Sequence, residues 1–162
     1  MPRPVRALAL LAACALLTAA ACREPAGAVG PVFVSTSVRG EGTIEHLRAR
    51  QRQWASLGLA DYDFDFAASC FCAPSYTQPA TVHVRGGRVA RVTPRGGHPA
   101  AELAAYPTID DLFARAIAAR QQDDFVEAEF DQRFGYPTTI TIGTLANDAG
   151  TRYEIANVRL AR

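Results

Sequence analysis

The sequence predicts a two-layer α+β fold, in which an antiparallel sheet of about six strands is covered on one face by two helices. Two segments, 44–57 and 109–117, carry apolar residues at helical spacing. Each is followed by segments in which apolar and polar residues alternate, the pattern of strands with one face in water. Strands with one charged face are typical of antiparallel sheets that pack helices on their other face. The predicted order is therefore one helix and three strands, repeated once.

The first predicted helix has four large apolar residues on one face: Ile44, Leu47, Trp54 and Leu57. Thr43 is a residue type that caps helix N-termini, and Gly58 is one that ends helices. In the next segment, 62–66, aromatic residues alternate with Asp63 and Asp65, which predicts a half-buried strand.

A tight hairpin is predicted over residues 82–89. Gly86 and Gly87 stand between two alternating segments, and glycines readily adopt the positive φ angles that a two-residue hairpin turn requires. These two strands complete the first half of the domain.

The second half begins with a helix whose buried stripe consists of Ile109, Leu112, Phe113, Ala116 and Ile117. Thr108 and Asp111 have the spacing of a capping box at its start. Alternation then predicts strands over 126–131, 139–142 and about 152–160. A turn is predicted at residues 135–137, Gly-Tyr-Pro.

The N-terminus has the pattern of a bacterial lipoprotein export signal. Arg3 and Arg6 precede about eleven apolar residues, and a row of alanines leads to Cys22. The apolar run is shorter than the roughly 20 residues that a membrane-spanning helix needs. We therefore expect residues 1–21 to be a cleaved signal peptide and Cys22 to carry a lipid that anchors the chain to a membrane.

Two alternatives are open at this level. The motif Leu-Ala-Ala-Cys ending at Cys14 also matches a lipoprotein signal, but its hydrophobic region would be too short. Ordinary cleavage near Ala21 would leave Cys22 as a free or paired thiol in a periplasmic or secreted protein. With a lipid on Cys22 the domain would face the periplasm, and Arg23 in place of Asp favours the outer membrane of a Gram-negative cell.

Residues 22–42 are expected to form a flexible tether, because they are rich in Gly, Pro, Ser and Val and have no sustained period. Residues 43–162 then form a single α+β domain of common size. The chain has 17 basic residues, all of them Arg, and 16 acidic residues. Without a basic block, this balance gives no support for nucleic-acid binding.

Cys70 and Cys72 are the two thiols of the predicted domain. In a regular strand their side chains would share one face with Cα atoms roughly 6.5–7 Å apart, so a disulfide between them needs a local bend. In an exported protein we expect this disulfide to form at the strand end, before the 74–79 loop. A thiol redox site or a soft-metal site for copper or zinc is the alternative, although further ligands are missing. A pair of buried free thiols is the third interpretation.

No catalytic motif is recognisable, and no cofactor is expected. The histidines, His46, His83 and His98, are expected at the surface, with His83 on the solvent side of its strand. Five carboxylates would form an acidic strip if their strands were neighbours, although a solvated sheet face explains them as well: Asp63, Asp65, Glu127, Glu129 and Asp131.

A succession of short motifs resembles a bacterial family of exported proteins, domain of unknown function 6174. The motifs are Trp54, Asp61-Tyr62-Asp63-Phe64, Cys70-Phe71-Cys72, Val82-His83-Val84-Arg85-Gly86-Gly87-Arg88-Val89, Pro107-Thr108-Ile109-Asp110-Asp111-Leu112-Phe113 and Phe134-Gly135-Tyr136-Pro137. The resemblance covers the folded domain and implies a small secreted protein or lipoprotein without an established activity. Gly143 departs from the pattern, which has Asp there, and this puts any cation role of the following loop in doubt.

These observations favour a non-catalytic binding module of the cell envelope. Its partner would be an envelope protein or peptide, held on the open sheet face or on the aromatic loop that contains Phe71 and Tyr76. The redox or soft-metal site at Cys70 and Cys72 is the competing hypothesis.

Overall fold

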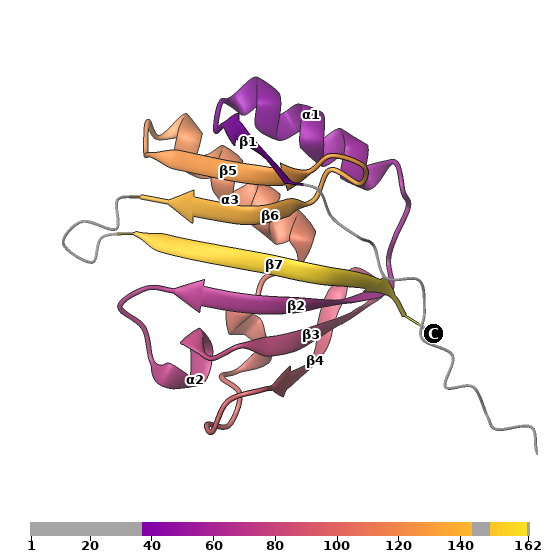
Figure 1. Cartoon of the computed structure of the whole chain (residues 1–162), viewed down its shortest axis with the longest axis vertical. Coiled ribbons are helices and arrows are strands. Elements are labelled where there is room, and N and C mark those ends of the chain that lie inside the picture. Colours follow the sequence, from indigo (N-terminus) through magenta and orange to yellow (C-terminus); the bar gives the residue numbers. More distant parts are fainter. Residues whose placement is uncertain (1–36, 144–149, 162) are drawn as a thin grey trace, which may run out of the picture.

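The computed structural model describes residues 37–143 and 150–161, and it has an α+β fold with a seven-stranded antiparallel sheet (Figure 1). The strand order across the sheet is β1-β5-β6-β7-β2-β3-β4. The strands are β1 (Ser37–Glu41), β2 (Tyr62–Ser69), β3 (Ala80–Arg85), β4 (Arg88–Pro94), β5 (Val126–Asp131), β6 (Pro137–Ile142) and β7 (Thr151–Leu160). The two three-strand units predicted from the sequence are confirmed, and β7 joins them by pairing with β2.

The longer helices, α1 (Ile44–Ala55) and α3 (Ile109–Gln121), pack against each other and lie behind the sheet in the view of Figure 1. Tyr62 of β2 shows how both reach the same face. The Trp54 ring of α1 meets the Tyr62 ring edge-on at 5.3 Å, and the backbone N–H of Ile109 donates to Tyr62 Oη at 3.2 Å. The predicted two-layer architecture, with one face of the sheet covered by helices, is confirmed.

The helix boundaries follow local signals. Thr43 Oγ1 accepts a hydrogen bond from the backbone of His46, and the capping box of Thr108 and Asp111 is formed as predicted. The first helix ends at Ala55, so Leu57 lies beyond it and is 36% exposed rather than part of the buried stripe. In α3 the buried stripe extends to Ala119, whereas Ile117 is only partly buried.

Strand β1 was not predicted. Its residues fall in the range expected to be a tether, but their backbone pairs antiparallel with β5, from Ser37 opposite Asp131 to Glu41 opposite Glu127. Gly42 follows in close contact with β5, since a Cβ at this position would lie 2.1 Å from the carbonyl oxygen of Val126. The prediction of a tether up to residue 42 is therefore wrong for residues 37–42. The expected signal peptide, Cys22 and the tether up to residue 36 lie outside the described residues.

Two short helices were also not predicted: α2 (Pro74–Thr77) and the 3-10 helix η1 (Leu103–Ala105). Pro74 suits the first position of α2, where the missing N–H has no intrahelical partner to lose. This turn of helix occupies the segment expected to be the 74–79 loop. None of the helices in the described ranges is long and apolar enough to cross a membrane.

Candidate functional site

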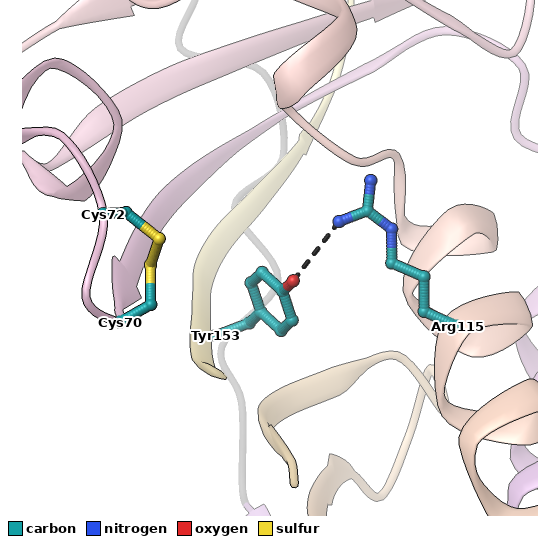
Figure 2. Close-up of a disulfide and its surroundings, with 4 residues drawn as sticks. All are labelled: Cys70, Cys72, Arg115 and Tyr153. Atoms are coloured by element: carbon teal, nitrogen blue, oxygen red, sulfur yellow. Dashed lines mark hydrogen bonds between the residues drawn. A yellow bond between two sulfur atoms is a disulfide. The ribbon is translucent and has the colours of Figure 1, made fainter. Parts of the chain in front are cut away.

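The candidate site begins where β2 ends, at the disulfide between Cys70 and Cys72 (Figure 2). Alternate residues of β2 up to Ala68 are buried in the core, and Cys70 follows in the same register. The chain then bends at residues 70 and 71, which brings the two Cα atoms to 5.2 Å, closer than in a regular strand. The disulfide and the local bend expected from the sequence are thus both present.

Phe71 and Tyr76, which the sequence places in one candidate loop, have different environments. Phe71 lies between the bridged cysteines and is 87% exposed. Tyr76 is partly buried on α2, and its ring packs against Phe66 at 5.8 Å and Tyr106 at 5.4 Å. The two aromatic residues of the predicted partner-binding loop therefore differ: Phe71 is exposed, whereas Tyr76 is partly buried and packs against the core.

A pocket of about 650 Å³ opens beside the disulfide. Its walls come from the end of β2, the C-terminal half of α3, the end of β6 and the start of β7. Phe71, Ile142 and the alanines 118 and 119 contribute apolar surface, while Arg115 and Asp124 contribute charge. Gly143 also lines the pocket and has a φ of +76°, a conformation that favours glycine.

Arg115 and Tyr153 form the polar wall of this pocket. Arg115 projects from α3 and its Nη1 donates to Tyr153 Oη at 3.3 Å. Figure 2 shows the Tyr153 ring lying between the disulfide and the guanidinium group. The guanidinium carbon is also 6.0 Å from the centre of the Tyr153 ring, within the range of a cation–π contact. The two residues come from α3 and β7, which are brought together only by the packing of the helix on the sheet.

The phenol of the partly buried Tyr76 interacts with both Arg115 and Tyr153. Burial raises the pKa of Tyr76 to about 12, with the neighbouring Tyr153 adding to the shift and Arg115 opposing it. Although burial acts to lower the pKa of Arg115, hydrogen bonds with Tyr153 and Tyr76 hold it above its usual value. The phenol of Tyr76 is therefore neutral and Arg115 is charged across the physiological pH range.

The histidines do not contribute to this pocket. His83 is on the outer face of the sheet as predicted, with Nδ1 3.0 Å from Asp63 Oδ1 and Nε2 3.0 Å from Thr93 Oγ1. His46 packs on the Phe130 ring, and His98 is in the exposed loop after β4. Within residues 37–143 and 150–161, no group of three or more His, Cys, Asp or Glu side chains is placed to hold a metal ion.

The hypothetical acidic strip does not form. Asp63 and Asp65 are on β2 and Glu127 and Glu129 are on β5, and two strands separate them. Asp131 is fully buried, because the register shifts at the end of β5 and its Oδ1 accepts hydrogen bonds from the backbone N–H groups of Arg133 and Phe134.

Sequence reasoning did not identify Arg115 or Tyr153. Arg115 interrupts the apolar pattern of α3 like any exposed helix residue, and Tyr153 is one inward residue of an alternating strand. Since they are 38 positions apart, no spacing within the sequence indicates that they meet.

Comparisons with known proteins give one family. Residues 46–160 match the family of unknown function DUF6174, and this match covers most of the chain. Neither the curated proteins nor the solved structures gave a match. The matched range spans α1 to the end of β7, including the disulfide and every residue of the pocket. The chain therefore belongs to the DUF6174 family.

Proposed function

We propose that this domain is a non-catalytic binding module that holds a peptide segment of a partner protein in the pocket beside the disulfide. The observation that carries this proposal is the placement of Phe71, a large apolar side chain that is 87% exposed at the pocket. Aromatic residues, Phe included, are enriched in the cores of protein–protein interfaces.

The disulfide supports this role because it restrains Phe71. The side chain is carried between two bridged residues, so little backbone freedom remains to be lost on binding. Preorganisation of a contact residue improves affinity mainly by lowering this entropic cost. A partner side chain that covers Phe71 would also contact Ile142 and the apolar part of α3.

The chemistry of the pocket wall favours binding over catalysis. Its described polar side chains are Arg115, Gln122, Asp124, Thr151 and Tyr153, and the hydrogen bonds among them do not pair a nucleophile with a base. This composition suits recognition of a polar group together with an apolar side chain.

We further propose that the module is held at a bacterial membrane by a lipid on Cys22, facing the periplasm. The support is the sequence alone: a short apolar run after two arginines, small residues before Cys22 and a following segment rich in Gly and Pro. The intact mass of the protein purified from a bacterial membrane fraction tests this. We expect a chain that starts at Cys22 with added acyl mass, whereas a start elsewhere without acyl mass would contradict it.

The binding role is tested by selecting short peptides from a displayed library against the full chain. Phe71→Ser should weaken the selected peptides by on the order of tenfold or more. Leu57→Ser is the matched control, because Leu57 is also an exposed apolar residue but lies beyond α1, outside the pocket. Failure to recover peptides that depend on Phe71 would contradict the proposal.

A redox role of the same cysteines is the second candidate, favoured by the exposure of Cys72 and by the place of the bridge in the pocket wall. A thiolate on a partner would attack one sulfur and release the other as a thiolate, giving a mixed disulfide. In the single variant Cys72→Ser or Cys70→Ser, the remaining thiolate would attack a disulfide of an oxidised partner and release one partner sulfur as a thiolate. The variant has no second cysteine to resolve the mixed disulfide, so isolating that species would support this role. A copper or zinc site would instead require ligands in addition to the two sulfurs.

A further inference from the structure

The charge of Arg115 has no acidic partner among the residues that the structure describes. Its hydrogen bonds are to the hydroxyl groups of Tyr153 and Tyr76, and no carboxylate of the described residues lies within ion-pair distance. A guanidinium group has five N–H donors, and two phenols do not saturate them. A protein charge that is left in this way beside a pocket is complementary to an anion.

The planar shape of the Arg115 guanidinium group indicates that the anion is a carboxylate. A planar guanidinium binds the two oxygens of a carboxylate with two parallel hydrogen bonds. The hydroxyl group of Tyr153 lies at the same wall and provides an O–H donor for one of these oxygens. The pocket thus places a cation and a hydroxyl donor side by side.

Other groups of the pocket disfavour an anion with several charges. Asp124 lines the same pocket, and the C-terminal residues of α3 bring the negative end of the helix dipole to it. A phosphate or a polyanion would be repelled by both. A single carboxylate carries one negative charge, so these two groups repel it less than they repel a phosphate, while Arg115 attracts it.

The position of Phe71 indicates what is attached to the carboxylate. Phe71 and Ile142 are apolar members of the pocket wall that contains Arg115, so an apolar side chain next to the anion would have a surface to cover. The C-terminus of a peptide has both parts, an α-carboxylate and the side chain of its last residue.

We propose that the pocket recognises the free C-terminal carboxylate of a peptide, with Arg115 and Tyr153 binding the carboxylate and Phe71 covering the last side chain. This inference rests on the proposed peptide-binding function and specifies the part of the peptide that is bound.

The test compares N-acetyl-Ala-Ala-Leu, N-acetyl-Ala-Ala-Phe and N-acetyl-Ala-Ala-Val, each as the free acid and as the C-terminal amide. Affinities for the full chain are measured by calorimetry, and the Nε resonance of Arg115 is followed by NMR. We expect the acids to bind roughly ten to a hundred times more tightly than the amides, as for hydrogen bonds to a charged group. The Arg115 resonance should shift only with the acids.

Arg115→Gln should remove the preference for the acid, and Arg115→Lys should restore part of it, since Lys retains the charge but not the planar pair of donors. Arg88→Gln is the matched control, because it removes the same charge from the exposed strand β4 and should leave the preference unchanged. The wild-type NMR shift does not depend on whether the Arg115 variants fold.

Equal binding of acids and amides, with dependence on Phe71, would overturn the carboxylate inference and leave the binding function standing. Binding of sodium sulfate to Arg115 as tightly as the best acid would also overturn it, by showing an unselective anion site. If none of the six peptides binds, the inference is overturned, and the library selection separately decides the binding function.

Discussion

Two charged side chains of this domain, Asp65 and Arg115, differ in how many partners they have within the protein. Asp65, on the outer face of β2, is only 8% exposed. It accepts hydrogen bonds or ion pairs from four side chains: Thr81, Arg95, Asn157 and Arg159. Arg115 is on the helix side of the sheet, and its hydrogen-bond partners among residues 37–143 and 150–161 are phenols. The difference follows from burial: the carboxylate of Asp65 is buried and needs protein partners, whereas Arg115 is exposed, so water solvates its charge and a ligand could reach it.

The backbone itself contributes to the compensation of Asp65. The register of β7 against β2 shifts between Asp63 and Asp65, and Asn157 of β7 has a positive φ of 50°. Asn tolerates this conformation better than most residues. From there its Nδ2 donates to Asp65 Oδ2 at 2.9 Å. The irregularity of the strand therefore places a partner on the carboxylate.

We call Asp65 and its four partners the compensated cluster, and Arg115 with its phenols the uncompensated cluster. The largest effect on stability is expected from Asp65→Ala, which removes the carboxylate at the centre of the compensated cluster. We expect the free energy of unfolding to fall by about 2 kcal/mol, since two arginines and an amide lose their acceptor but remain partly solvated. Urea unfolding measures this. Glu154→Ala is the control: its ion pair with Arg152 is exposed, so its loss should cost less than about 0.5 kcal/mol. Equal costs would mean that Asp65 is not a structural centre.

A smaller loss is expected when both cysteines of the pocket are replaced by Ser. The disulfide closes a very short loop, so its removal should lower the free energy of unfolding by about 1–2 kcal/mol. Library peptides whose binding depends on Phe71 should also bind several times more weakly, because the backbone of Phe71 is no longer restrained by the disulfide. A variant with lower stability but unchanged peptide affinity would show that the disulfide does not prepare Phe71 for binding.

Acidification should act on the compensated cluster. Burial acts to raise the pKa of Asp65, but hydrogen bonds from Asn157 and Thr81 and the charges of Arg95 and Arg159 hold it below its usual 3.8. A carboxylate with a lowered folded-state pKa contributes its full stabilisation above the unfolded-state value and loses it as the pH falls through the folded-state value.

The stability advantage of the wild type over Asp65→Asn should therefore be smaller at pH 3 than at pH 7. Urea unfolding of both proteins at the two pH values checks this. An advantage that stays constant with pH would show that the ionised form of Asp65 is not the stabilising one.

The smallest effect on stability is expected from Arg115→Gln, which alters the uncompensated cluster. Without an ion pair to lose, the free energy of unfolding should change by less than about 0.5 kcal/mol. Thermal or urea unfolding measures it beside the Asp65 variant. A loss of stability comparable to that of Asp65→Ala would mean that Arg115 supports the fold as Asp65 does.

Features that depend on neighbours in the chain could be predicted well. The alternation of β2, the capping box of α3 and the hairpin turn at Gly86 and Gly87, with φ of +57° and +72°, each follow from a few adjacent residues. Features that depend on a distant partner could not. Strand β1 has no periodicity of its own and forms because β5 offers its backbone.

The sequence by itself predicted the two long helices, most of the strands and the exposed and buried faces of the sheet, because these depend on spacing along the chain. It also favoured the pairing of Cys70 with Cys72 over a redox or metal site and over free thiols. Only the tertiary structure decided the rest. The packing of α3 on the sheet joins Arg115 to Tyr153, and the pairing of β2 with β7 brings Asp65 to Asn157, which is 92 positions away. Contacts of this kind leave no pattern in a single sequence, because they depend on how whole elements are placed against one another.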